Sequence, residues 1–146
     1  MSTDLRLALL HTFINTCPAY LKLDVNSLVP ASADASFRRY FRVRGSGDNT
    51  FIVMDAPPEK EDCRPFLNVA TLFSAAGVHV PAVLAQNLQQ GFLLLDDFGS
   101  RTYLDELNPS NAPKLYGEAI DALVKLQANT RVEVLPLYDQ ALLMHE

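Results

Sequence analysis

Arginine side chains are concentrated in one short stretch of this acidic chain. Four arginines fall within residues 37–44, whereas the whole chain has a formal net charge of -5. The five residues before them, positions 32–36, are small, and no acidic residue lies between positions 37 and 47. A chain of phosphates binds to backbone N–H groups and guanidinium groups, so the stretch predicts a phosphate-binding lip beside a strand. The four arginines are Arg38, Arg39, Arg42 and Arg44.

The same arginines could instead form the solvated outer face of a strand, with their long side chains packed over neighbouring residues. On a strand, Arg39 shares a face with Phe37 and Phe41, so we expect Arg39 to be the partly buried one. Ser36 could donate to a phosphate oxygen, but ordinary turn chemistry is the more frequent role of a serine in such a place. Both interpretations stay open at this point.

Three aspartates at strand ends are further candidates for chemistry. Asp96 and Asp97 resemble a catalytic pair, but adjacent residues of an extended chain point in opposite directions. We therefore expect backbone contacts from this segment, with Asp97 capping the next turn. Asp55 follows an apolar strand, where it either holds an arginine or is simply a charge at the strand end, and the second interpretation is slightly favoured.

Composition and charge restrict the class of protein. With 146 residues, 49% hydrophobic and 20% charged, the chain can form one ordinary core and a fragment of a second. Its acidic balance argues against a general nucleic-acid partner. Cys17 and Cys63 form no disulfide framework or zinc spacing, which fits a reducing cytosol. Residues 1–17 lack a signal-peptide pattern and no apolar run reaches bilayer length, so we expect a cytoplasmic protein with no membrane partner.

Apolar periodicity and breaker residues predict the order of the elements. Helices are predicted over residues 4–15, 63–76, 102–107 and 113–128, with another starting in 138–146. Strands are predicted near Leu28 and over residues 37–44, 50–55, 82–86 and 92–95. Residues 51–54 are apolar on both faces, which predicts a central strand. The apolar stripe from Phe66 to Phe73 is predicted to belong to the core rather than to a cofactor site.

This order indicates an α+β fold. We expect about five antiparallel strands with one crossing helix over residues 1–99, followed by a helical segment over residues 100–146. The apolar faces of the helices after Thr102 have no partner of comparable size in this chain. We therefore interpret residues 100–146 as the beginning of a second, truncated lobe, and exposed faces of this kind favour self-association.

Three stretches of the sequence resemble the small lobe of the protein-kinase-like phosphotransferases. They are residues 34–43 (Asp-Ala-Ser-Phe-Arg-Arg-Tyr-Phe-Arg-Val), residues 53–61 (Val-Met-Asp-Ala-Pro-Pro-Glu-Lys-Glu) and residues 92–99 (Phe-Leu-Leu-Leu-Asp-Asp-Phe-Gly) with 102–104 (Thr-Tyr-Leu). The sequence is similar to the aminoglycoside-phosphotransferase family, and within it to the bacterial kinases of the anomeric hydroxyl of N-acetylmuramate and N-acetylglucosamine. The resemblance covers most of the chain from Ser32 onward.

The resemblance implies a small lobe that cradles ATP. A loop at residues 32–36 would cover the phosphates, arginines of the following strand would neutralise their charge, and a hinge at residues 95–98 would offer backbone groups to adenine. A larger lobe outside this chain would supply the magnesium ligands, the catalytic Asp and the contacts with the sugar acceptor. The implied ATP-binding residues are Ser32, Ala35, Ser36, Arg38, Arg39, Arg42, Leu95, Asp96, Asp97 and Phe98.

The sequence departs from the family pattern in ways that bear on catalysis. It has no Gly-x-Gly-x-x-Gly loop, and Met54 stands about where the strand lysine belongs. The helix predicted over residues 63–76 contains no acidic residue to pair with such a lysine. Either an arginine of residues 37–44 takes the lysine's role, or the phosphate contacts come mostly from the backbone.

The family's catalytic loop is also missing, because none of His11, His79 and His145 precedes Gly-Asp. We therefore predict no catalytic residue and no metal ligand in this chain, and no phosphate transfer by the chain alone. Two hypotheses follow: the ATP-binding portion of a sugar kinase, or a non-catalytic nucleotide-binding or protein-interaction module of pseudokinase type. An open reading frame that continues past Glu146 into His-Gly-Asp favours the first, and a stop codon there favours the second.

Overall fold

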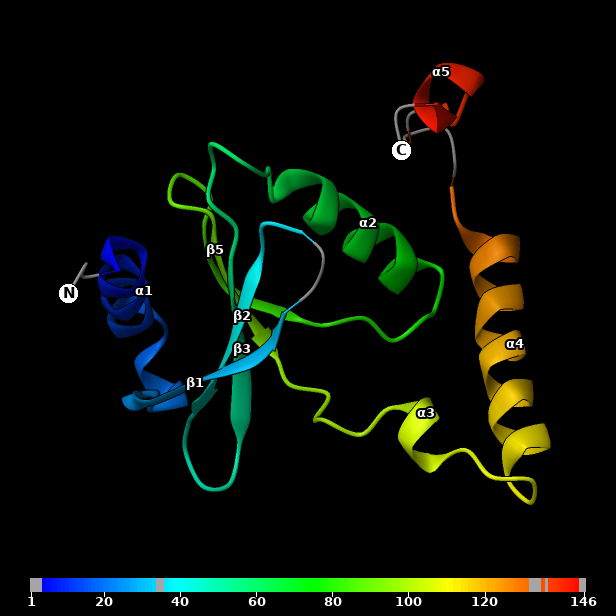
Figure 1. Cartoon of the computed structure of the whole chain (residues 1–146), viewed down its shortest axis with the longest axis horizontal. Coiled ribbons are helices and arrows are strands. Elements are labelled where there is room, and N and C mark those ends of the chain that lie inside the picture. The colour runs from blue at the N-terminus through cyan, green and yellow to red at the C-terminus, as the bar shows by residue number, and fades with distance from the viewer. Residues whose placement is uncertain (1–3, 34–35, 132–134, 136, 145–146) are drawn as a thin grey trace.

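An antiparallel sheet organises the chain up to Asp96 (Figure 1). The computed structural model describes residues 4–33, 36–131, 135 and 137–144. Within these residues the sheet has five strands in the order β1-β2-β3-β5-β4, which confirms the predicted α+β class. β3 lies in the centre, as its two apolar faces predict. The strands are β1 (Asp24–Ala33), β2 (Arg39–Arg44), β3 (Thr50–Asp55), β4 (Val83–Asn87) and β5 (Phe92–Asp96).

Two hydrophobic clusters stabilise the two faces of this sheet. On one face, α1 (Leu5–Thr16) buries Leu10, Phe13 and Ile14 in a cluster that includes Val53. On the other, Met54 and two leucines of β5 meet the beginning of α2 (Arg64–Ala75). Neighbouring residues of β3 enter different clusters because strand side chains alternate between faces. Each fully buried apolar side chain contributes about 1.5–3 kcal/mol.

β1 is longer than the short strand predicted near Leu28. It extends to Ala33, with irregularities in its register against β2. It is an edge strand, and there the missing N–H of Pro30 can face away from the ladder. As a consequence, Ser32 pairs with Tyr40 inside the sheet, so its prediction as a loop residue is wrong. β2 correspondingly begins at Arg39 rather than at position 37.

The apolar stripe of α2 is covered less than the sequence predicts. Phe66 and Leu67 pack against the cluster of Met54, but both are only partly buried. No residue within α2 is buried, so the prediction of a core stripe up to Phe73 is wrong. The reason is geometric, since only the first turns of the helix lie over the sheet's hydrophobic cluster and the rest faces open hollows.

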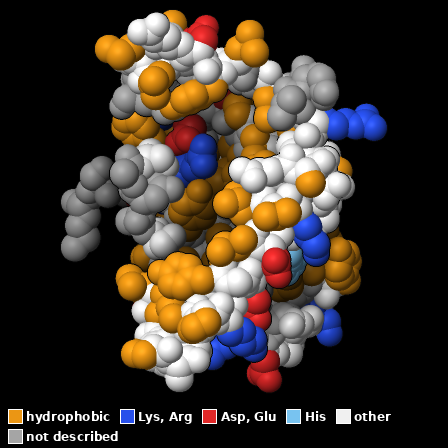
Figure 2. All heavy atoms as spheres, turned by 90° about the vertical axis from the view of Figure 1, so that its right-hand side faces the viewer, with side chains coloured by type: hydrophobic (Ala, Val, Ile, Leu, Met, Phe, Trp, Pro, Cys, Tyr) orange, Lys and Arg blue, Asp and Glu red, His pale blue; other side chains and the backbone are white. Residues whose placement is uncertain are grey.

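The helices after the sheet stand apart from it (Figure 1). They are α3 (Tyr103–Glu106), α4 (Ala112–Asn129) and α5 (Gln140–Leu143), and no residue of α4 is buried. Apolar side chains on α4, among them Tyr116, Ile120 and Leu123, are more than half exposed. Figure 2 shows hydrophobic side chains gathered around a hollow on this side of the molecule. None of the helices in the described part of the chain combines the length and hydrophobicity needed to cross a bilayer.

Gly91, in the turn between β4 and β5, is required for two separate reasons. Its φ of +73° lies in the left-handed region, and a Cβ placed there would be 1.8 Å from the carbonyl oxygen of Ala56. The two residues are already tied together, because the Ala56 N–H donates to the Gly91 carbonyl oxygen at 2.8 Å.

We predict that Gly91→Ala lowers the free energy of unfolding by more than about 1–2 kcal/mol, the cost of a left-handed backbone alone. The loss is larger because the backbone at position 91 must also move away from the Ala56 carbonyl. Gly47→Ala is the matched control: its φ is +65°, but nothing lies within 4 Å of the added Cβ. Urea unfolding of both variants measures the difference. Equal losses in the two variants would contradict this account.

Candidate functional site

One pocket lies where β1, β2 and the segment after β5 meet. Its volume is about 470 Å³, within the range of small-molecule sites. Tyr40, Ile52 and Phe66 give it an apolar wall. Many of the residues that the sequence analysis singled out line this pocket, although they are far apart in the chain. They are Ser32, Arg42, Leu95, Asp96, Asp97 and Phe98.

The aspartates at the end of β5 have separate partners, as expected for adjacent residues of an extended chain. Asp96 is joined to Ala82 twice: its Oδ1 accepts from the Ala82 N–H at 2.8 Å and its own N–H donates to the Ala82 carbonyl at 3.1 Å. Asp97 turns to β2 and β3 instead. The two carboxylates therefore do not form a catalytic pair.

The Asp97 carboxylate is the most heavily bonded group of the pocket. It forms an ion pair with Arg42, which also donates from Nη2 to Oδ1 at 3.1 Å. The Thr50 hydroxyl donates to Oδ2 at 2.7 Å and the Gly99 N–H donates to Oδ1 at 2.8 Å. The Asp97 side chain is 3% exposed. The hydrogen bond from Arg42, opposed by burial and helped by Thr50 and Gly99, lowers the pKa of Asp97 to about 2.

Asp97 was predicted to cap the next turn. Its carboxylate does accept a hydrogen bond from the Gly99 N–H in that turn, but it caps no helix. The following helix, α3, is capped by Thr102, whose side chain accepts from the Asp105 N–H at 3.3 Å. The main partner of Asp97 is an arginine 55 residues away in sequence. Neither residue's local sequence signals this pairing.

Arg38 lies at a second hollow, of about 420 Å³, that shares Phe66 and Pro81 with the first. Its guanidinium forms an ion pair with Glu61. Glu61 precedes α2 by a few residues. It therefore lies outside residues 63–76, the range in which the family pattern predicts the acidic partner of the cation. The charged run at residues 59–62 is the sequence signal that could have found it.

Arg39 points to the opposite face of the sheet, where α1 lies. Its Nη2 donates to Asp55 Oδ2 at 2.6 Å, and it also pairs with Asp4. Asp55 is fully buried and pairs with Arg6 of α1 as well. Of the two interpretations of Asp55, the arginine-holding one is therefore correct, and the slightly favoured one, a strand-end charge without such a role, is wrong. The Arg6 guanidinium also lies 4.5 Å from the centre of the Phe92 ring.

The positive charge of residues 37–44, which has no acidic neighbour in the sequence between positions 37 and 47, is thus balanced from elsewhere in the chain. Each of its three candidate arginines has a carboxylate partner brought from elsewhere in the sequence. Ser36 also has a local role, since its Oγ accepts from the Arg38 N–H at 3.1 Å in a turn. Ala35 lies outside the described residues. Ser36, Arg38 and Arg39 do not line the pocket at the end of β5.

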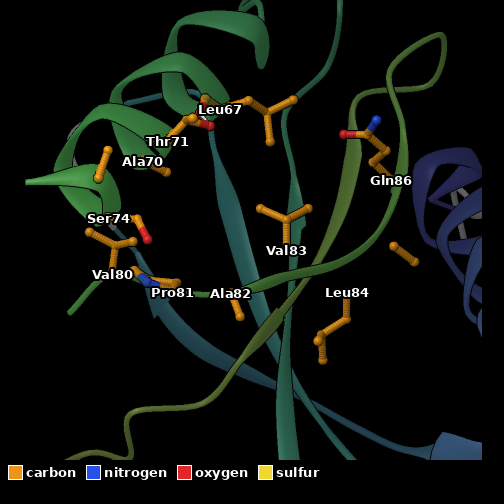
Figure 3. Close-up of a pocket in the computed structure, with 12 residues that line it drawn as sticks. Leu67, Ala70, Thr71, Ser74, Val80, Pro81, Ala82, Val83, Leu84 and Gln86 are labelled. Carbon is orange, nitrogen blue, oxygen red and sulfur yellow. Dashed lines mark hydrogen bonds between the residues drawn. The ribbon is translucent and has the colours of Figure 1, made fainter. Parts of the chain in front are cut away.

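A larger hollow, of about 870 Å³, lies between α2 and β4. Figure 3 shows Leu67 and Thr71 on the helix across from Val83 on the strand. None of the residues that line it is charged, so it is a poor match for a triphosphate. Within the described residues, no group of three or more His, Cys, Asp or Glu side chains is placed to hold a metal ion. The Met54 side chain is fully buried in its cluster.

Comparison with known proteins supplies a family for this arrangement. Residues 27–141 match the phosphotransferase enzyme family. The chain is 50% identical to an N-acetylmuramate/N-acetylglucosamine kinase of Pseudomonas aeruginosa over its whole length, which is 45% of that relative. Relatives of the same name from Pseudomonas putida and Neisseria meningitidis are 52% and 42% identical over 88% and 80% of this chain, and 38% and 35% of their own lengths. The chain thus spans less than half the length of the curated relatives it matches.

We predict that the Asp97 ion pair makes stability depend on pH in the acid range. The pKa of Asp97 is lowered on folding, so its contribution is complete above about pH 5 and is lost as the pH falls toward 2. The excess unfolding free energy of the wild type over Asp97→Asn should fall by about 2 kcal/mol between pH 5 and pH 2.

Urea unfolding at a series of pH values measures this difference, with Asp121→Asn on exposed α4 as the control. Asp121→Asn should show no such change in its difference from the wild type. A constant difference between the wild type and Asp97→Asn across this range would contradict the prediction.

Proposed function

The chain belongs to the phosphotransferase enzyme family, and on that premise we propose that it is the ATP-binding portion of an ATP-dependent kinase. We propose that the acceptor is the anomeric hydroxyl of an amino sugar, N-acetylmuramate or N-acetylglucosamine, in peptidoglycan recycling in the cytoplasm. The names of the relatives support the acceptor. In this proposal residues 1–99 form the nucleotide-binding small lobe, and residues 100–146 begin the larger one.

The observation that carries the nucleotide site is the convergence of Ser32, Arg42 and residues 95–98 on one pocket. Leu95 and Asp96 end the largely buried strand β5, and Asp97 and Phe98 follow it directly, so this backbone is held against a rigid sheet. In our proposal this backbone binds the adenine edge, while Tyr40 and Ile52 contribute apolar surface for the ring. We place the phosphates toward Ser32, which lines the pocket from β1, and toward Ser36, which lies in the turn before Arg38.

Arg38 is our candidate for the role of the missing lysine. It stands at the hollow that adjoins the pocket, and Glu61 holds its guanidinium there. A carboxylate before α2 paired with a cation before β2 has the chemistry of the lysine–glutamate pair that orients phosphates in kinases. We give Arg39 a supporting role. It pairs with buried Asp55 on the other face of the sheet, and this pairing fixes the backbone next to Arg38.

The reaction itself would be completed by residues outside this chain. The acceptor hydroxyl would attack the γ-phosphorus as the bond to the β–γ bridging oxygen breaks, and a carboxylate of the larger lobe would take the hydroxyl proton. Magnesium, bound by ligands that we also place in the larger lobe, would neutralise charge on the phosphates. The residues of this chain would bind and orient ATP.

The second candidate, a non-catalytic module of pseudokinase type, is favoured by two observations: Met54 stands about where the strand lysine belongs, and these 146 residues contain no His-Gly-Asp. The gene discriminates between the two. We expect the reading frame beyond codon 146 to encode His-Gly-Asp followed by Asn and a further Asp. The product of the whole frame should convert ATP and N-acetylmuramate or N-acetylglucosamine into the sugar 1-phosphate, detected by ³¹P NMR. A frame without that motif, or no phosphorylation of either sugar, would favour the module.

We predict that Arg38→Ala weakens binding of ATP-magnesium to this chain about tenfold, because a charge-assisted contact to a phosphate is lost. Binding of adenosine, which has no phosphate, should be unchanged. Arg38→Lys should recover part of the loss because the positive charge is kept. Chemical-shift titration by NMR suits the weak binding expected of half a cleft.

Arg44→Ala is the matched control, because Arg44 is an exposed arginine at the end of β2 that is farther from Arg38 in the sequence. It should bind ATP as the wild type does. If Arg38→Ala and Arg44→Ala behave alike, Arg38 is not the substitute for the lysine.

A further inference from the structure

We propose that Arg42, Thr50 and Asp97 form a hinge latch, a set of positioning residues that fixes the backbone of residues 96–98 for recognition of the nucleotide base. This inference rests on the proposed function, and it assigns Arg42 a role different from contacting phosphate. The position of Arg42 among the arginines of residues 37–44 predicts a contact with phosphate. The structure instead directs its guanidinium into the hinge.

The latch ties the hinge to two neighbouring strands. Arg42 comes from β2 and Thr50 from the beginning of β3, and both donate to the same carboxylate. A guanidinium that binds both oxygens of a carboxylate fixes its plane as well as its position. The third donor, the Gly99 N–H, extends this restraint past the hinge to the residue at which the backbone turns. Rotation of the backbone at Asp97 would therefore break bonds to three segments at once.

Burial makes this restraint strong. The Asp97 side chain is almost inaccessible, and Arg42 is 27% exposed, so water competes weakly for these bonds. The residues on either side are held differently: Asp96 is bonded to Ala82, and the Phe98 ring, although half exposed, lies 4.5 Å from the ring of His79. The ladder between β3 and β5 ends at the pair of Phe51 and Asp96, so beyond it the Asp97 side chain continues the attachment of the hinge to the β2–β3 hairpin.

The same contacts argue against a direct chemical role for either charge. Both Asp97 oxygens accept hydrogen bonds, so the carboxylate has little capacity left to act as a base. The positive charge of Arg42 is balanced by Asp97 rather than offered to a phosphate. The two residues can nevertheless decide how well a base fits, because their contacts hold the backbone that we propose binds it.

The test separates base recognition from phosphate binding. Affinities of the chain for ATP-magnesium and for inorganic tripolyphosphate-magnesium are measured by NMR titration for the wild type, Thr50→Val, Thr50→Ser and Asp97→Asn. Thr50→Val removes the hydroxyl at nearly constant shape, and Thr50→Ser keeps it. We expect Thr50→Val and Asp97→Asn to bind ATP at least fivefold more weakly, with tripolyphosphate affinity changed less than twofold. Thr50→Ser should bind both ligands as the wild type does.

Hydrogen exchange gives a readout that needs no ligand. The amides of residues 97–99 should exchange faster in Thr50→Val than in Thr50→Ser, while the amides of α1 keep their wild-type rates. This comparison also identifies a variant that has lost its fold, because α1 would then exchange faster too.

Several results would overturn the latch. Unchanged ATP affinity in Thr50→Val and Asp97→Asn, or equal losses for ATP and tripolyphosphate, would show that these residues do not act on the base. Unchanged exchange at residues 97–99 would show that they do not hold the hinge. A wild-type chain that binds tripolyphosphate but shows no preference for ATP would contradict the proposed nucleotide site, and the latch with it.

Discussion

The alternation of side chains along β2 is the constraint on which the candidate site depends. Consecutive residues of a strand face opposite sides of the sheet, so Arg39 is directed toward α1 while Arg42 is directed toward the hinge. Each guanidinium then meets a carboxylate that is almost or completely inaccessible to solvent, Asp55 on one side and Asp97 on the other. An ionised carboxylate in such a place is costly unless it is paired and hydrogen-bonded, so each arginine is needed where it lies. The strand thus joins two charged contacts through one rigid backbone.

This arrangement links the two ends of the proposed nucleotide site. Arg38 directly precedes β2 and Arg39 is its first residue, whereas Arg42 lies further along the strand at the proposed hinge. The ladder between β2 and β3 pairs all six residues of β2 in register, so both ends of β2 are held in the same rigid part of the sheet. The α4 segment is different, because its apolar side chains remain exposed and contribute little burial to the stability of this chain. The sheet and its two helices are the part that can hold a site in place.

Sequence patterns predicted the positions of the helices and strands well, and they predicted less well how far β1 extends and how deeply α2 is buried. The central position of β3 followed from residues 51–54, and α1, α2 and α4 begin and end within a few residues of their predicted bounds. The length of β1 was missed because Pro30 reads as a strand breaker, although an edge strand tolerates it. The burial of α2 was overestimated because an apolar stripe shows that a helix can be covered, not that the chain supplies enough surface to cover it.

The sequence by itself determined the fold class, the family and several of the residues that line the pocket at the end of β5, because periodicity and short motifs are local properties of the chain. It also determined that the strand lysine and the catalytic loop are missing from these 146 residues. Only the tertiary structure decided what each arginine does. The partners Glu61, Asp55 and Asp97 lie 23, 16 and 55 residues from Arg38, Arg39 and Arg42, so no local count of charge could find them. Charge pairing is set by distance in space, and the folding of the sheet creates those distances.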